Sequence, residues 1–118
     1  MAKSRIKKFK EERADLNKAL VRFAGKNMKR LLSIDNRVYE AGALPAATKE
    51  LLGLVASTVL RCDDCIFYHV DRCHELGISR DELEEALAIA FAVGGTITIP
   101  HLRRAVRAWE ELQSGSEK

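Results

Sequence analysis

Apolar residues recur at the spacing of an α-helix along most of this chain. In residues 6–23 they form a loose stripe on an otherwise charged segment that ends at Gly25, a pattern typical of an amphipathic helix. Residues 28–38 repeat the spacing and predict a second helix that closes near Gly42. The segment 1–25 is therefore expected to be an amphipathic helical arm.

The middle of the chain predicts a more apolar helix. Pro45 suits the first turn of a helix, and residues 46–60 after it contain few polar positions, among which Glu50 stands out. A helix that is apolar nearly all round would leave part of that surface exposed in a monomer of this size. An obligate homo-oligomer is therefore expected.

The second half of the chain predicts three more helices. Their apolar faces span residues 66–76, 83–93 and 101–112, and the first of them is expected to begin near residue 64. Gly77 is placed to end the first of them, and Ser79 with Glu82 forms a capping box that starts the next. The alternating residues 96–99 are interpreted as a helix start or kink, because one four-residue strand would have no partner.

The composition agrees with a single all-α domain. The 118 residues are 47% hydrophobic, which is enough for one packed core, and the two prolines and 6% aromatic share favour helices over strands. The predicted fold is a compact helical bundle of about six helices. Its expected divisions are a basic amphipathic arm at 1–25, a helical domain at 26–113 and a disordered tail at 114–118.

Charge is distributed unevenly along the chain. Residues 1–30 hold 11 Lys and Arg against three acids, and residues 31–118 hold nine against 14, so the two parts carry +8 and −5. Such an asymmetry can mark a nucleic-acid or membrane-surface contact. The basic residues lack the interleaved aromatic side chains that stack on bases. A basic helix beside an acidic neighbour or a second subunit is the preferred interpretation, and no nucleic-acid partner is expected.

The cysteine content suggests chemistry rather than structural crosslinks. No stretch reaches the roughly 20 apolar residues of a membrane span, and no apolar signal region follows the basic start. A cytoplasmic protein without a membrane partner is expected. Three cysteines cannot all pair within the chain, and structural disulfides are rare in the cytoplasm. Redox or metal chemistry is the expected use of these thiols.

The candidate chemistry begins with the C-x-x-C sequence of Cys62 and Cys65. It lies where a helix should begin, and the unpaired N–H groups and dipole of a first turn lower a thiol pKa. Asp63 and Asp64 would oppose this effect if they point at the sulfurs, or they cap the helix instead. His69 shares a helix face with Cys65 at i+4 and can accept its proton.

Glu50 joins this group if residues 46–60 and 64–76 form an antiparallel hairpin that turns near Arg61. His69 lies eight residues after the turn and Glu50 eleven before it. At ~1.5 Å per residue the axial offset is about 5 Å, which a glutamate side chain or one bridging water spans. Glu50 is therefore predicted to orient His69 and relay protons to solvent.

These four residues carry a family resemblance. The order Glu50, Cys62, Cys65 and His69, separated by eleven, two and three residues, resembles the signature of the alkylhydroperoxidase D and carboxymuconolactone decarboxylase family. The similar helical layout extends over about residues 46–109. The resemblance implies an all-α fold, trimers or hexamers, and a thiol-dependent peroxidase or disulfide-reducing activity that needs no cofactor or metal.

The resemblance also implies a role for each residue. Cys65 would be the attacking thiol, Cys62 the resolving thiol, and His69 with Glu50 the proton relay. The substrate would be a small-molecule peroxide or disulfide, and an external dithiol or thiol protein would reset the pair. Asp64 stands where the best-studied peroxidase members have a histidine. Decarboxylase members generally lack the cysteine pair, which argues against a lyase reaction.

Several alternatives stay open. Cys62, Cys65 and His69 could hold a metal ion, although Cys73 lies about 16 Å from Cys62 along a continuous helix and could not complete the site. The cysteine pair could also be small buried hydrophobic residues, as is expected for Cys73. Further alternatives are a non-enzymatic redox-sensing or oligomeric interaction protein, whose arm binds the partner, and a carboxymuconolactone decarboxylase-like lyase. His101 could line the pocket or a subunit contact.

Overall fold

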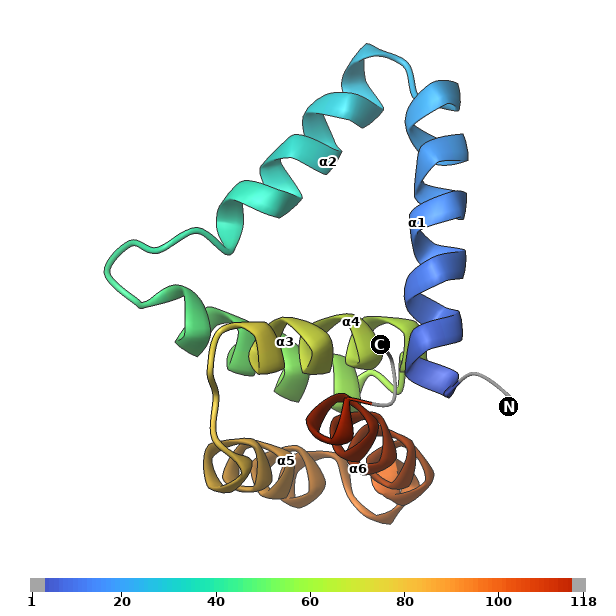
Figure 1. The fold of residues 1–118 in the computed structure, drawn as a ribbon. Helices are drawn as coiled ribbons and strands as arrows, with labels where there is room; N and C mark the ends of the chain where they lie inside the picture. Colours follow the sequence, from blue (N-terminus) through green and yellow to red (C-terminus); the bar gives the residue numbers. More distant parts are fainter. Residues whose placement is uncertain (1–3, 116–118) are drawn as a thin grey trace.

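The part of the chain that the structure describes is built entirely of helices. This computed structural model describes residues 4–115, which hold six α-helices, one short 3-10 helix and no strand (Figure 1). In chain order these are α1 (Arg5–Phe23), α2 (Lys26–Val38), α3 (Ala46–Val59), α4 (Asp63–Glu75), α5 (Arg80–Gly94), η1 (Thr96–Thr98) and α6 (Ile99–Ser114). The predicted all-α class and number of helices are confirmed, and residues 96–99 are helical.

Helices α3 to α6 form the core of the molecule. Helix α3 packs against both α4 and α5, and α4 packs against α6. Leu54 from α3 and Ile66 and Val70 from α4 are fully buried at the centre of the apolar cluster, and Trp109 and Leu112 close it from α6. These four helices bury most of the apolar faces that their sequences indicated, although Ile89 and Val93 of α5 and Val106 of α6 are exposed.

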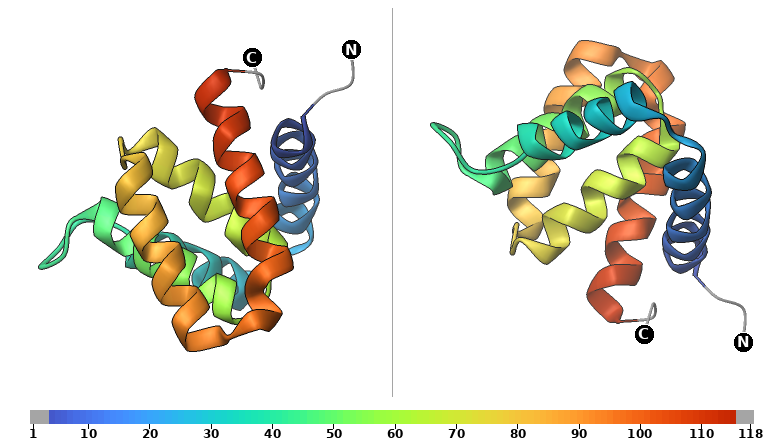
Figure 2. Two further views of the ribbon diagram at one scale, coloured as in Figure 1. Left: turned by 90° about the horizontal axis from the view of Figure 1, so that it is seen from below. Right: turned by 90° about the horizontal axis from the view of Figure 1, so that it is seen from above.

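Helices α1 and α2 form an arm on this core. Figure 1 shows them as two sides of a triangle, with α3 and α4 as the third side. The first turns of α1 hold it to the core: Ile6 is fully buried, and the Phe9 ring stands edge-on to Phe67 at 5.5 Å. Figure 2 shows α1 alongside α6. Helix α2 has no buried residue, so its apolar side chains face outward or toward the opening of the triangle.

A short connection joins α3 to α4 and sets the position of the cysteine pair. Arg61 has φ +60°, the left-handed region that L side chains rarely adopt. Backbone hydrogen bonds close the turn, from Arg61 N–H to Thr58 C=O at 3.0 Å and from Cys62 N–H to Ser57 C=O at 3.1 Å. The predicted tight corner is thus present, and it leaves Cys62 at the N-cap of α4.

Caps are present at the two ends of the described chain, where α1 begins and α6 ends. Ser4 caps α1, whose C-cap is Ala24, and Gly115 ends α6 in the left-handed conformation. Ser114 therefore still belongs to α6. Residues 1–3 of the expected arm and residues 116–118 of the expected tail lie outside the described residues. None of the described helices is long and apolar enough to cross a membrane.

Candidate functional site

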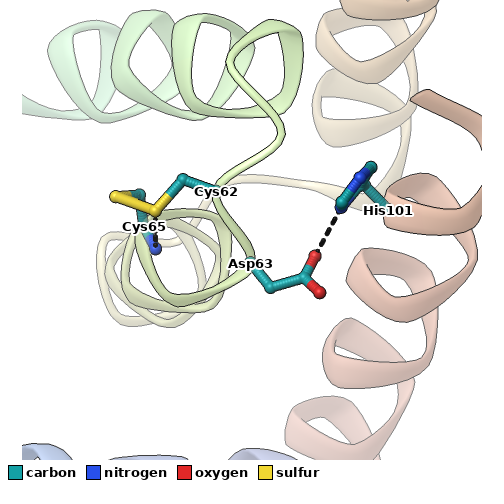
Figure 3. Close-up of a disulfide and its surroundings, with 4 residues drawn as sticks. All are labelled: Cys62, Asp63, Cys65 and His101. Carbon is teal, nitrogen blue, oxygen red and sulfur yellow. Dashed lines mark hydrogen bonds and ion pairs between the residues drawn. A yellow bond between two sulfur atoms is a disulfide. The ribbon is translucent and has the colours of Figure 1, made fainter. Parts of the chain in front are cut away.

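Cys62 and Cys65 occupy the first turn of α4 and are joined by a disulfide bond (Figure 3). Their Cα atoms are 5.3 Å apart, within the range that a disulfide spans. The Cys62 sulfur also accepts a hydrogen bond from the Cys65 N–H at 3.3 Å. A sulfur in this place faces the positive end of the α4 dipole, which favours the thiolate once the bond is reduced.

The two sulfurs differ in access. Cys65 is exposed and Cys62 is half-buried. A cavity of about 520 Å³ lies between the arm and the start of α4. It is lined by Phe9, Glu12, Arg13, Leu16, Asn17, Leu20, Asp35, Tyr39, Ser57, Asp64, Cys65, Tyr68 and His69. Cys65 therefore faces a space large enough for a small molecule, and Cys62 is not among the residues that line it.

His69 and Glu50 form a buried pair beside this cavity. Their side chains come from α4 and α3, with 6% and 1% of their surfaces exposed, and His69 Nδ1 lies 2.8 Å from Glu50 Oε1. When Nδ1 carries the hydrogen and donates it to the carboxylate, Nε2 is left as a proton acceptor. The predicted proximity of the two residues is confirmed, by direct contact and without a bridging water.

Glu50 has a second cationic neighbour. The Arg72 Nε lies 3.8 Å from Glu50 Oε2. A buried carboxylate is costly unless it is paired and hydrogen-bonded. His69 on one oxygen and Arg72 near the other supply that compensation, so the carboxylate is held ready to stabilise a positive charge on the imidazole ring.

Gly53 makes room for the His69 ring. A Cβ atom at this position would lie 2.6 Å from His69 Cε1, closer than side chains approach one another. Sequence reasoning missed this residue. The available signal was a glycine inside a predicted helix, three residues after Glu50, since such a glycine usually has a packing or functional reason.

Two tyrosine rings flank His69. The Tyr39 and Tyr68 ring centroids lie 5.3 Å and 5.2 Å from that of His69. Burial, and secondarily nearby acids that include Glu50, raise the pKa of both hydroxyls, which keeps them neutral donors. The Arg13 guanidinium lies 4.3 Å from the centre of the Tyr68 ring. Tyr39 and Arg13 come from the arm, and no motif in the sequence indicated them.

The site in its disulfide form has no hydrogen bond between Cys65 and His69 among the described residues, although both line the same cavity. Within residues 4–115 no group of three or more His, Cys, Asp or Glu side chains is placed to hold a metal ion. Cys73 is a free, fully buried thiol of the core, and burial raises its pKa to about 12. It lies in the core, as expected.

The two acids between the cysteines point in different directions. Asp64 lines the cavity with Cys65, whereas Asp63 faces α6 and approaches His101, with Asp63 Oδ1 2.7 Å from His101 Nδ1 (Figure 3). Arg104 Nε lies 2.8 Å from the other Asp63 oxygen. His101 is not among the residues that line the cavity.

Comparison with known families matches residues 25–110 to the sequence profile of the Carboxymuconolactone decarboxylase family. A Cupriavidus necator protein, H16_B0147, is 32% identical over 73 residues. This alignment covers 62% of the chain and 65% of that protein, just under two thirds of its length.

Solved structures share the fold over nearly the whole chain. Two crystal structures of the Thermotoga maritima protein TM1620 have TM-scores of 0.90 and 0.86 and sequence identities of 54% and 56%. They cover 94% and 91% of this chain, and 97% and 91% of their own. The second is described as a carboxymuconolactone decarboxylase family protein, with a suggested part in an antioxidative response. A Legionella pneumophila protein of the same family, lpg0406, is 31% identical with a TM-score of 0.69, covering 92% and 97% of the two chains.

Proposed function

The chain belongs to the carboxymuconolactone decarboxylase family, and from this premise we propose that it is a thiol-dependent oxidoreductase of the alkylhydroperoxidase D type. It reduces a small peroxide or disulfide while Cys62 and Cys65 alternate between dithiol and disulfide. One observation carries the proposal: Cys65 and His69 line the same cavity, and Glu50 holds His69 at 2.8 Å. The suggested antioxidative part of the Thermotoga protein supports it.

The first step of the proposed cycle is activation of Cys65. His69 Nε2 takes the thiol proton, and the Glu50 carboxylate stabilises the imidazolium that forms. The thiolate then attacks the terminal oxygen of a hydroperoxide, so that the O–O bond breaks. Cys65 becomes a sulfenic acid, and the alkoxide leaves as an alcohol after taking the proton from His69.

The second step is resolution by Cys62. Its sulfur attacks the Cys65 sulfenic acid, water leaves, and the disulfide forms. The dithiol has then lost two electrons and the peroxide has gained them. The Cα separation of 5.3 Å suits this bond without rearrangement of the α4 start. With a disulfide substrate, the first adduct is a mixed disulfide and Cys62 expels the second thiol.

An external dithiol or a thiol protein closes the cycle by returning two electrons and two protons to the disulfide. Exposure of Cys65 at the cavity supports attack by such a reductant. A reducing compartment is needed for the dithiol form to recur. We therefore place the protein in the cytoplasm.

The proposed working form is a homo-oligomer, a trimer or hexamer as the family resemblance implies. The arm exposes a set of large apolar side chains: Leu16, Phe23, Leu31, Ile34 and Val38. Contiguous exposed apolar surface commonly marks an interface. Light scattering at micromolar concentration should give three or six times the chain mass of 13.2 kDa, and a clean monomer would contradict this part of the proposal.

The test of the activity combines an assay with mass spectrometry. Reduced protein is treated with an organic hydroperoxide, with and without a dithiol, and its alkylated peptides are analysed while peroxide consumption is followed. We expect a reversible Cys62–Cys65 disulfide and catalytic loss of peroxide. Cys65→Ser should abolish turnover, Cys62→Ser should trap an adduct on Cys65, and Cys73→Ser is the control that keeps turnover.

Each alternative gives a different result in this assay. Full activity in Cys65→Ser or Cys62→Ser would refute the assigned roles. Reversible oxidation without turnover of peroxides or disulfides would favour a redox sensor. Cysteines that stay reduced would return the pair to a structural or metal-binding role.

A further inference from the structure

The two carboxylates in the first turn of α4 have different surroundings. Asp64 shares the cavity with Cys65. Asp63 turns away from both sulfurs and toward α6, as Figure 3 shows. A negative charge close to a thiol raises its pKa, because it disfavours the thiolate. The direction in which Asp63 points therefore bears on how reactive the cysteine pair is.

Each oxygen of the Asp63 carboxylate has its own partner on α6, an imidazole for one and a guanidinium for the other. His101 Nδ1 lies 2.7 Å from Oδ1, and Arg104 Nε lies 2.8 Å from Oδ2. His101 and Arg104 stand three residues apart on one face of α6, and all three side chains are half-buried. Arg104 Nη2 also lies 3.3 Å from His101 Nδ1, but arginine can only donate and reaches Nδ1 only when that atom carries no hydrogen. With the hydrogen on Nδ1, the imidazole donates to the shorter contact, the carboxylate. The contact of Arg104 is an ion pair and not a hydrogen bond, since its buried Nε has no hydrogen-bond partner among the described residues. Together with the His101 contact it ties Asp63 to a helix that packs against α4.

We infer that His101 and Arg104 are positioning residues, which hold the Asp63 carboxylate away from the cysteine pair and offset its charge, so that Cys65 ionises readily. The inference rests on the proposed dithiol cycle, in which the Cys65 thiolate is the attacking group. The positive Arg104 guanidinium balances the carboxylate. Without these partners the carboxylate would keep its full charge one residue from Cys62 and two from Cys65.

A stepwise set of variants tests this. The double variant His101→Asn with Arg104→Gln removes both partners, and Asp63→Asn is then added to it. The readout is the rate at which iodoacetamide alkylates Cys65 in the reduced protein as a function of pH, with Cys62 and Cys65 distinguished by peptide fragmentation. Cys65 also faces charged residues that stay unchanged in every variant: Glu12, Arg13, Asp35, Asp64 and His69.

We expect the double variant to raise the Cys65 thiol pKa by about one unit, which slows alkylation about tenfold below that pKa. Adding Asp63→Asn should restore the original profile, because the uncompensated charge is gone. If the contacts of Asp63 with α6 only stabilised the fold, adding Asp63→Asn to the double variant would not restore the Cys65 alkylation profile, since it restores none of the lost contacts. Arg107→Gln, one turn further along α6 and paired with Glu110, is the control with no expected shift.

The inference is overturned by an unchanged alkylation profile in the double variant, or by failure of Asp63→Asn to rescue it. If the double variant does not fold by circular dichroism, Arg104→Gln alone and with Asp63→Asn gives the same comparison with a smaller shift. The assay contains no substrate, so its outcome is separate from the proposed function. Rescue of the thiol pKa without peroxide or disulfide turnover would refute the activity alone.

Discussion

Helices α3 to α6 bury their apolar side chains against one another, whereas the arm of α1 and α2 leaves most of its own exposed. Leu54 in α3 is 0% exposed and Leu31 in α2 is 67% exposed. Helix α1 buries only Ile6 among its described residues, and α2 buries none. The sequences already differ, because α1 and α2 are charged helices with one apolar stripe, whereas α3 is apolar on nearly all sides.

This difference divides the candidate site into two parts. The core supplies Glu50, Cys62, Cys65 and His69, which come from the mutually packed helices α3 and α4 and their connection. The arm supplies a wall of the cavity, including side chains of α1 and α2 and Tyr39. Groups that exchange protons need a fixed geometry, and the core provides it.

Matched leucine substitutions should give the largest contrast between the two regions. Leu54→Ala leaves a cavity in the core and should lower the free energy of unfolding by about 2–5 kcal/mol. Leu31→Ala removes only exposed surface and should change it by less than about 0.5 kcal/mol. The measurement is urea unfolding at a dilution where light scattering shows a monomer, because Leu31 belongs to the proposed subunit interface and would be covered in the oligomer. Equal losses in the two variants would show that the arm is as firmly packed as the core.

Alanine substitution of one glycine in the core and one in the arm compares how much each region controls turnover. Gly53→Ala places a methyl group 2.6 Å from His69 Cε1, so the ring must shift from its present place beside Glu50. Displacement of a catalytic group by about 1 Å can lower a rate by about 100-fold, and we expect turnover to fall by about 10- to 100-fold. The His69 imidazole resonances in an NMR spectrum should shift at the same time.

The control for that substitution lies in the arm. A Cβ atom at Gly25 meets nothing within 4 Å, and Gly25→Ala should leave both turnover and the His69 resonances unchanged. Full activity in Gly53→Ala would show that the position of the ring does not limit the reaction. A matching loss in Gly25→Ala would mean that the arm controls the site more closely than its packing indicates.

The helices could be predicted from sequence because their apolar periodicity is local. The residues at which the helices begin and end are harder to predict, because they depend on caps and turns without a regular pattern. Helix α4 begins at Asp63, before the apolar face at residue 66, because Cys62 serves as the N-cap. Cysteine is not among the preferred capping residues. Arg61 takes a left-handed conformation that usually favours glycine, so the form of this turn could not be predicted either.

The candidate site could be predicted where its residues are close in sequence. The pairing of His69 with Glu50 follows from a hairpin with a very short connection, whose geometry is nearly fixed. The contact of Asp63 with His101 joins residues 38 positions apart and depends on the angle at which α6 crosses α4. The approach of Tyr39 to His69 depends on how the arm folds back. Such angles result from the packing of the whole core, which no local pattern encodes.

A pH titration tests how completely the core excludes water, and its expected effect is the smallest of the three. Burial raises the pKa of the Cys73 thiol from 9.0 to about 12. The contribution of this thiol to the free energy of unfolding is therefore fully present below pH 9. It is lost as the pH rises toward 12, because Cys73 ionises in the unfolded chain before it ionises in the folded one. At pH 10 this loss is about 1.4 kcal/mol.

Cys73→Ala removes the titrating group, so the variant should lose about 1.4 kcal/mol less than the original chain between pH 8 and pH 10. Urea unfolding without reductant measures this, because Cys62 and Cys65 do not titrate while they form a disulfide. The raised pKa values of Tyr39 and Tyr68 act equally in both proteins and cancel in the difference. Identical pH profiles would mean that water reaches Cys73, and that the core is as open as the arm.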